Sequence, residues 1–194
     1  MKYVRPLNLF RDLLKGNALE RGRFLGLDVG DKYVGLAVSD PDNKIASPLS
    51  VLFRKKTNMH LMALDFQRLI SELSLSGFIV GYPFDGQRRN VDVCSLSLEI
   101  HHYSLSSLLD ITLFCIQAVQ VKIFIDDLCK TGKLEGVKYT FWDECFTSKN
   151  VELLIKPLKL PPILSKTIID KFAAVGILQG YLDHFNRRPE LEER

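Results

Sequence analysis

The sequence predicts an α/β domain in which a mixed β-sheet is packed between helices. Short apolar segments bounded by glycine, proline or aspartate indicate strands, and longer segments with apolar residues at helical spacing indicate helices. Strands come first, strands and helices then alternate, and helices close the chain, an order typical of layered α/β domains. With 194 residues, 46% hydrophobic and 25% charged, the chain can bury one core and is unlike disordered, collagen or coiled-coil sequences.

Five apolar runs are expected to form the strands of this sheet. The first two lie on either side of Gly30-Asp31, a turn signal, and therefore predict a β-hairpin. The third follows the turn residues Pro41-Asp42-Asn43, and the fourth stops at Gly81. The expected strands, in chain order, are residues 24–29, 33–39, 45–53, 78–80 and 137–142.

The helices are predicted from capping residues, breakers and apolar stripes. Thr57 is expected to cap a helix that runs to about Leu73, with Gly77 as the residue that terminates it. Thr147 or Ser148 is expected to cap another helix, which three later prolines interrupt. In the Thr57 helix the inner stripe is expected to comprise Leu61, Leu64, Leu69 and Ile70. The remaining helices are expected at residues 6–15, 119–129 and 165–184.

The domain organisation follows from these elements and from one segment, residues 93–117, that shows the pattern of neither a helix nor a strand. Residues 1–22 are expected as an N-terminal helical extension, 23–186 as the domain and 187–194 as a polar tail. From Val91 to Val121 there is no lysine or arginine, and residues 93–117 show no clean period, so they predict an insertion. It is either a functional loop or translated non-coding sequence such as a retained intron, and we favour the second.

The net charge and the cysteine content bear on the binding partners and the cellular compartment to be expected. The formal net charge of +3 is too small to indicate a nucleic-acid partner without a local basic patch. The four cysteines form no C-x-x-C pair, which disfavours structural zinc and a disulfide scaffold and favours a reducing compartment. No secretory signal or membrane span is indicated, and import into an organelle is possible without being indicated, so the cytosol is expected.

Four acidic residues are candidates for chemistry. Asp28 interrupts an apolar strand, Asp143 and Glu144 follow another strand, and Asp170 lies in an apolar helix. Each has a plainer explanation: a turn aspartate, a solvated pair, and a surface aspartate balanced by a neighbouring lysine. Carboxylates from three elements, taken together, predict a Mg²⁺ or Mn²⁺ site of the kind that activates water for attack on a phosphate.

A glycine-bounded loop and the basic residues that follow it are candidates for phosphate binding. The loop runs from Gly81 to Gly86, and Arg88 and Arg89 follow almost at once. Lys32, beside the Asp28 hairpin, is a further candidate, although a plain turn with a solvated basic edge explains the same residues. Tyr82 and Trp142 flank this region and offer base stacking, but packing is the favoured role for both.

Four blocks in order resemble the YqgF (RuvX) family, whose fold is RNase H-like and related to RuvC-type Holliday junction resolvases. The blocks are FLGLDVGDKYVGLAVSD, FIVGYPFDG, FWDECFTS and IIDKFAAVGILQGYLD. The resemblance implies a three-layer fold with a mixed five-stranded sheet, and makes Asp28, Glu144 and Asp170 the metal-binding catalytic carboxylates. The residues then expected at the nucleic acid are Lys32, Gly81, Gly86, Arg88, Arg89 and Thr147. The family usually has arginine after the Asp-Glu pair, where this chain has Cys145.

The resemblance implies a metal-dependent nuclease that matures the 5′ end of the small-subunit ribosomal RNA precursor, as a monomer or homodimer. A Holliday junction resolvase acting on DNA four-way junctions is the nearest alternative. A non-catalytic RNA-binding ribosome-assembly factor stays open because of Cys145 and the insertion. An actin- or hexokinase-like ATPase is disfavoured, because such proteins need two related lobes and this chain shows no repeat.

Overall fold

The computed structural model describes residues 1–15, 22–54, 58–83, 105–143, 156–158 and 161–187. Its centre is a six-stranded sheet in the order β1-β6-β5-β2-β3-β4. The bounds are β1 Lys2–Tyr3, β2 Arg23–Val29, β3 Tyr33–Ser39, β4 Ala46–Phe53, β5 Leu75–Tyr82 and β6 Lys138–Asp143. Strands β2, β3 and β4 form an antiparallel meander, whereas β5 and β6 run parallel to β2. The predicted mixed sheet is therefore confirmed, with one strand more than expected.

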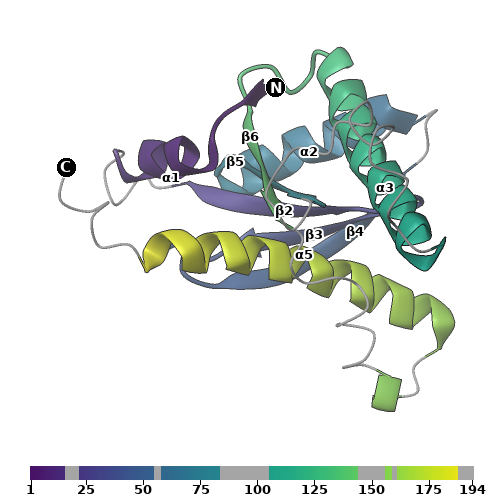
Figure 1. The fold of residues 1–194 in the computed structure, drawn as a ribbon. Coiled ribbons are helices and arrows are strands. Elements are labelled where there is room, and N and C mark those ends of the chain that lie inside the picture. The colour runs from purple at the N-terminus through teal and green to yellow at the C-terminus, as the bar shows by residue number, and fades with distance from the viewer. Residues whose placement is uncertain (16–21, 55–57, 84–104, 144–155, 159–160, 188–194) are drawn as a thin grey trace.

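Helices cover both faces of the sheet, which gives the predicted three layers. In Figure 1, α2 and α3 lie above the sheet and α5 runs along its other side. The helix bounds are α1 Pro6–Leu14, α2 Met59–Leu73, α3 Leu105–Lys130 and α5 Pro162–Asn186, with a short 3₁₀ turn at Lys156–Leu158. The predicted helix capped by Thr147 or Ser148 lies outside the described residues.

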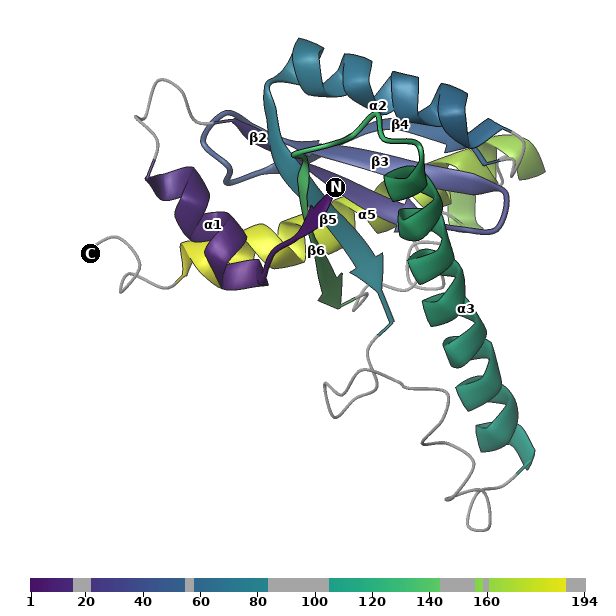
Figure 2. The same cartoon turned by 90° about the horizontal axis from the view of Figure 1, so that it is seen from above.

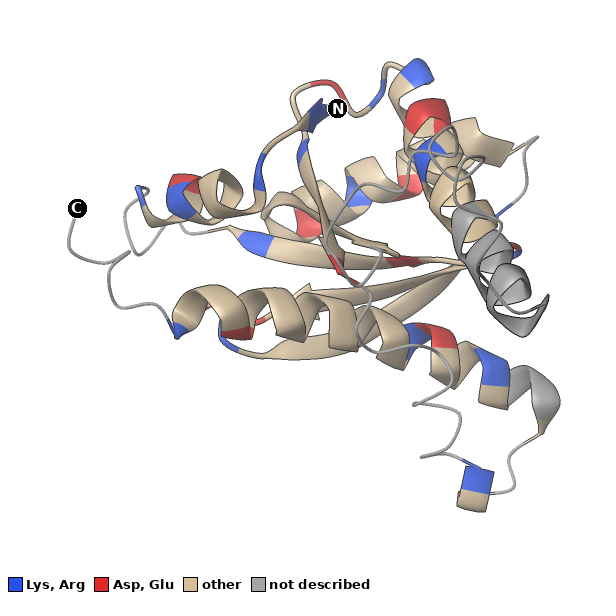
Figure 3. Ribbon diagram, viewed as in Figure 1, with Lys and Arg blue, Asp and Glu red and all other residues tan. Residues whose placement is uncertain are grey.

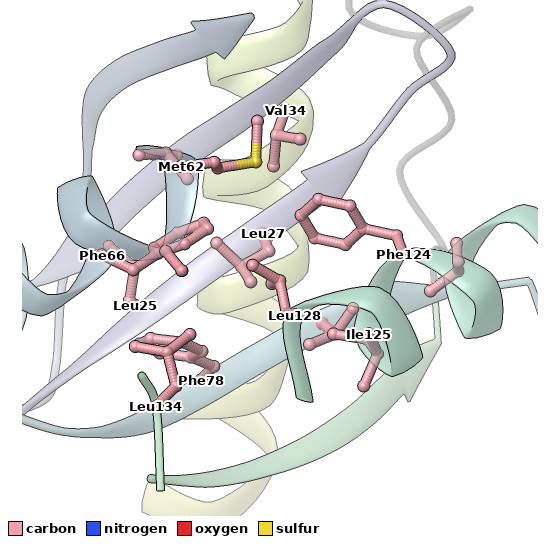
Figure 4. Packing of buried hydrophobic residues seen from close by; sticks show 14 of the residues in the cluster. Leu25, Leu27, Val34, Met62, Phe66, Phe78, Phe124, Ile125, Leu128 and Leu134 are labelled. Atoms are coloured by element: carbon pink, nitrogen blue, oxygen red, sulfur yellow. The ribbon is translucent and has the colours of Figure 1, made fainter. Parts of the chain in front are cut away.

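Two hydrophobic cores hold the layers together, one on each face of the sheet. Figure 4 shows the first, in which Phe66 of α2 and Phe124 of α3 meet Leu25 and Leu27 of β2. The second lies beneath α5 and contains Phe24 of β2. Because side chains alternate along a strand, Asp28 is directed to the face of Phe24, which α5 covers.

Helix α2 is rotated relative to the prediction. Its buried residues are Met62, Ala63 and Phe66. Of the expected inner stripe, Leu69 and Ile70 pack against the core, whereas Leu61 and Leu64 are 55% and 41% exposed, so the prediction is wrong for these two. Leucines occur on both sides of this helix, and the contact of Phe66 with Phe78 on β5 orients it instead. It ends at Leu73, as predicted, but its C-cap is Ser74 in the left-handed conformation, and Gly77 belongs to β5. Thr57, the predicted cap, lies outside the described residues.

Helix α3 begins well before the predicted residue 119, inside the predicted insertion. Its first half projects past the sheet in Figure 2. From Ile116 onward it buries Ala118, Val121 and Phe124, while Ile116, Val119 and Ile123 stay exposed. Both sides of the helix are thus apolar, which explains why no hydrophobic period was visible in the sequence. Among the described residues, no helix is long and apolar enough to span a membrane.

Residues 1–15 are built into the domain rather than appended to it. Strand β1 pairs in parallel with β6, a pairing that two residues without a pattern could not predict. Helix α1, at its predicted position, packs the ring of Phe10 against Phe24 and Phe185. Tyr181 of α5 donates a hydrogen bond to the carbonyl oxygen of Pro6 at 2.9 Å. The start of the chain therefore completes the second core.

Candidate active site at the carboxyl end of the sheet

The three parallel strands β2, β5 and β6 end at the same edge of the sheet. Leu27 is paired with Val80, and Tyr82 with Asp143, so Asp28 and Asp143 come from neighbouring positions along this edge. The carboxyl ends of parallel strands are where open α/β sheets place their sites. Two of the predicted acidic elements therefore end at this edge, on strands that β5 separates.

Gly35 lets the helix that carries Asp170 pack close to the strand that carries Asp28, because a glycine has no side chain to keep them apart. Asp28, only 8% exposed, is paired across β2 and β3 with Gly35. A Cβ atom added at Gly35 would collide with the backbone carbonyl of Asp170, so α5 rests directly on β3 at this point. Any side chain at position 35 would force the helix away from the strand. The sequence analysis missed Gly35, although a glycine amid the apolar residues of the neighbouring strand was the available signal.

A second glycine lets α5 approach β2 itself. A Cβ at Gly26 would lie 2.7 Å from Cβ of Leu178 and 2.9 Å from the carbonyl oxygen of Ala174. These distances are too short for real contacts, so Gly26 is needed for the same close packing. The two glycines together fix the height of α5 over the strand that carries Asp28.

The carboxylate of Asp170 is placed at an electrostatic cost. Its Oδ2 atom is buried and has no hydrogen-bond partner in the described part of the chain. Burial raises the pKa of Asp170, and the nearby charge of Lys166, one turn earlier on α5, acts in the opposite direction. A buried carboxylate oxygen without a donor is normally explained by a function or by a missing ion or water.

The donor chemistry of this edge fits a divalent cation. Asp28 and Asp170 offer hard carboxylate oxygens from a strand and a helix, the ligand type that Mg²⁺ and Mn²⁺ prefer. Within the residues that the structure covers, no group of three potential ligands occurs. Glu144, the third predicted ligand, directly follows Asp143 but lies outside the described residues, as do Gly86, Arg88, Arg89 and Thr147.

Gly81 and the two aromatic candidates are parts of the packed sheet. Gly81 is buried within β5, which continues to Tyr82, so it does not begin a loop as expected. A Cβ at Gly81 would strike Ile177 of α5. Tyr82 is 1% exposed, and the ring of Trp142 lies 5.3 Å from that of Tyr181. Packing, the favoured role, is therefore what the structure shows for both aromatic residues.

Basic side chains surround the carboxylate edge on the described elements. Lys32 is exposed in the β2–β3 turn. Lys122 of α3 lies 5.6 Å from the ring centre of Tyr82, and Lys166 of α5 lies 5.4 Å from that of Tyr33. Figure 3 shows basic and acidic positions side by side in the first half of α5. The site therefore combines a buried acidic centre with a cationic rim, a charge pattern suited to a phosphodiester backbone.

Arg54 holds the rim together and was missed by the sequence analysis. Its guanidinium donates to the carbonyl oxygens of Gly30 at 3.1 Å and Gln120 at 3.3 Å, and it lies over the ring of Phe124. Its backbone N–H donates to the carbonyl oxygen of Lys32. Burial lowers the pKa of Arg54, and the charges of two aspartates partly offset this. The β2–β3 turn is thereby tied to α3.

Comparison with known proteins agrees with this arrangement. The family model RuvX, described as Holliday junction resolvase, matches residues 22–102 and 116–184. A protein of Syntrophomonas wolfei named "Putative pre-16S rRNA nuclease" is 32% identical over 163 residues, which are 83% of this chain and 94% of that protein. One of the same name from Caldicellulosiruptor saccharolyticus is 29% identical over 84% of this chain and 99% of its own length.

Among solved structures, the RuvC of T. thermophilus in complex with a Holliday junction substrate aligns over 84% of this chain. The TM-score is 0.43 and the identity 13%. The family match covers most of the chain and includes Asp28, Glu144 and Asp170, and the resemblance seen in the four sequence blocks is confirmed. The chain belongs to the RuvX family.

Proposed function

We propose that the protein is a metal-dependent endonuclease that processes the 5′ end of the small-subunit ribosomal RNA precursor in the cytosol. The observation that carries the proposal is the apposition of Asp28 and Asp170 across Gly35, with a buried carboxylate oxygen that has no described donor. The relatives named for pre-16S rRNA support the choice of an RNA substrate.

In this proposal Asp28, Glu144 and Asp170 hold Mg²⁺ or Mn²⁺. When bound, such ions supply an activated water and neutralise charge on the scissile phosphate. The chain itself contributes position: β2 fixes Asp28, and the Gly35 contact fixes Asp170 beside it. The basic rim, with Lys32 and the arginines Arg88 and Arg89, orients the phosphate backbone.

Residues 93–117 are proposed as an insertion that is not needed for this chemistry. The family match omits residues 103–115, which lie inside the proposed segment. On the part of α3 whose side chains are described, from Ile116 onward, Ala118, Val121 and Phe124 are buried, and a chain shortened by 93–117 keeps all three. We therefore expect the shortened protein to fold and to be at least as active as the full chain.

A DNA four-way junction is the second candidate substrate, favoured by the description of the matching family. One experiment separates the two. The full chain, the chain lacking 93–117 and Asp28→Asn are each incubated with labelled ribosomal RNA precursor and with a four-way junction, with Mg²⁺ or Mn²⁺ present or chelated. Metal-dependent cutting of the RNA that Asp28→Asn lacks is the expected result.

If the protein cuts only the four-way junction, the RNA substrate is wrong and the DNA junction becomes the proposed substrate. If no form of the protein cuts either substrate, the nuclease proposal fails and a binding factor becomes the better explanation. Calorimetry with Mn²⁺ on the same proteins reads out metal binding independently of cleavage. Binding by the wild type that is lost in Asp28→Asn is expected there.

A further inference from the structure

An aromatic pair with a lysine over it lies directly beside the carboxylates and has no role in the proposed chemistry. Tyr33 and Phe53 are paired across β3 and β4, with ring centres 5.5 Å apart and ring planes tilted by 56°. Phe53 is 48% exposed although it is a large apolar side chain at the end of its strand. Exposed aromatic rings interleaved with cations are typical of surfaces that bind unpaired bases.

The Tyr33–Phe53 pair lies on the same face of the sheet as Asp28 and Asp170, and near the same edge. Tyr33 lies two residues before Gly35 on β3, so both are directed to the face that α5 covers. On α5, Lys166 lies one turn before Asp170 and reaches the ring of Tyr33. The four residues from Lys166 to Asp170 advance about 6 Å along α5, and the two from Tyr33 to Gly35 advance about 7 Å along β3, so Tyr33 lies about that far along the strand from the level of the carboxylates.

The cations around the pair make nucleic acid a better occupant than an apolar partner. Lys166 contacts Tyr33, and Lys32 immediately precedes it in the chain. The backbone of Arg54, the residue after Phe53, is bound to the carbonyl oxygen of Lys32, which fixes the two strand ends relative to each other. The two strand ends that carry the rings are thus bonded to each other, and Lys166 and Lys32 place positive charge beside them.

We propose that Phe53 and Tyr33 form a stacking platform for an unpaired base next to the scissile phosphate, with Lys166 and Lys32 binding the adjacent phosphates. This inference rests on the proposed function and deepens it, since it assigns a single-stranded segment of the substrate to a defined surface. The platform selects unpaired over duplex nucleic acid, because only an unpaired base can present its ring face.

Binding measurements test the platform without relying on cleavage. Full-length Asp28→Asn, with and without Phe53→Leu, is titrated into a fluorescent single-stranded RNA of about ten nucleotides, within the usual range of such sites. Phe53→Leu is expected to weaken binding about five- to tenfold, since a stacked base contributes in this range. Phe172→Leu is the matched control, because Phe172 is 47% exposed on α5 and lies outside the platform.

A scan with a single abasic residue identifies stacking itself. One abasic position is expected to weaken binding to the parent protein and to have no effect once Phe53→Leu is present, as in a double-mutant cycle. Lys166→Gln is expected to reduce the slope of log affinity against log salt by about 0.7. Thermal melting of each variant confirms that it is folded.

Equal binding by the Phe53→Leu and Phe172→Leu proteins, or an abasic effect that survives Phe53→Leu, would overturn the platform. These outcomes differ from failure of the nuclease proposal. Metal-dependent cutting with no effect of Phe53→Leu removes only the platform. Loss of all cutting with an intact abasic effect removes only the catalysis and leaves a single-strand binding surface.

Discussion

Buried polar side chains are hydrogen-bonded at one end of the central sheet, whereas at the other end one buried carboxylate oxygen has no described donor. At the β3–β4 turn, Ser39 accepts a hydrogen bond from the backbone of Phe24 and donates one to Asn43 at 2.6 Å. Asn43 in turn donates to the carbonyl oxygen of Gly22, and its own carbonyl oxygen accepts from Asn186. At the carboxyl end, by contrast, Oδ2 of Asp170 is buried with no donor among the described residues.

The difference separates a hydrogen-bonded network that stabilises the fold from the carboxylate that we propose as a metal ligand. A fully bonded polar network stabilises the end of the sheet where the chain turns. A carboxylate left without a donor costs stability, and close packing of α5 on Gly35 keeps it in place. Substitutions at the two ends should therefore change stability and activity in different proportions.

The largest expected effect comes from Gly35→Ala. The added methyl group would overlap the backbone of Asp170, so α5 must move away from β3 or the strand must distort. We expect a loss of about 3 kcal/mol or more in the free energy of unfolding, together with loss of metal binding. Chemical denaturation followed by tryptophan fluorescence measures the first, and Mn²⁺ calorimetry the second.

Gly180→Ala serves as the control, since a Cβ there lies 3.3 Å from the Trp142 nitrogen and touches no backbone. Its effect should stay within about 1 kcal/mol, because the gain in helix propensity offsets the tight contact. A Gly35→Ala protein that is as stable as the wild type would contradict the close packing of α5 on β3.

The next largest effect is expected at the opposite end, from Asn43→Ala. This change removes the bonds to Ser39 and Gly22 and places alanine at a φ of 54°, in the left-handed region. We expect destabilisation of about 2 to 3 kcal/mol, with cleavage per folded molecule unchanged. Thermal melting and an activity assay below the transition check this pair of results. Asn43→Gly should recover the backbone part of the loss.

A smaller effect is expected from Arg54→Met, which keeps the length of the side chain but removes its donors. The carbonyl oxygens of Gly30 and Gln120 lose their partner, and the β2–β3 turn loses its tie to α3. We expect about 1 to 2 kcal/mol of destabilisation. Faster amide hydrogen exchange at residues 30–33 than in the wild type would locate the effect, and unchanged exchange there would refute it.

The smallest effect, of opposite sign, is expected from Asp170→Asn. Burial raises the pKa of Asp170, so its ionised form is disfavoured in the folded protein and a neutral side chain relieves that cost. Because the group is partly exposed, the gain in metal-free stability should be below about 1 kcal/mol. Mg²⁺ should raise the melting temperature of the wild type and leave that of Asp170→Asn unchanged. A variant that still responds to Mg²⁺ would remove Asp170 from the site.

The site residues that could be predicted are those that stand out within one β-strand or one helix. Asp28 stands out because a carboxylate in an apolar strand needs an explanation, and Asp170 because it interrupts an apolar helix. What brings them together is Gly35, whose meaning depends on a helix more than a hundred residues away in the chain. Arg54 is hidden for the same reason, since its partners belong to other elements.

Errors in the fold prediction also have physical causes. Helix α2 carries leucines on both sides, so its buried stripe of Met62 and Phe66 is chosen by contact with β5 rather than by pattern. Helix α3 carries apolar residues on its exposed side as well as its buried side from Ile116 onward, and this conceals its helical period. Strand β1 is too short to show a period and exists because β6 offers an edge.

The joining of the chain's beginning to its end has a consequence for synthesis. The bond from Tyr181 to Pro6 spans 175 residues, and β1 has no partner until β6 has been made. Contacts between distant parts of a chain form late, so residues 1–15 should dock only after α5 leaves the ribosome. Resistance of this segment to a protease would thus mark completed chains, and a nascent chain cut short before α5 would expose it.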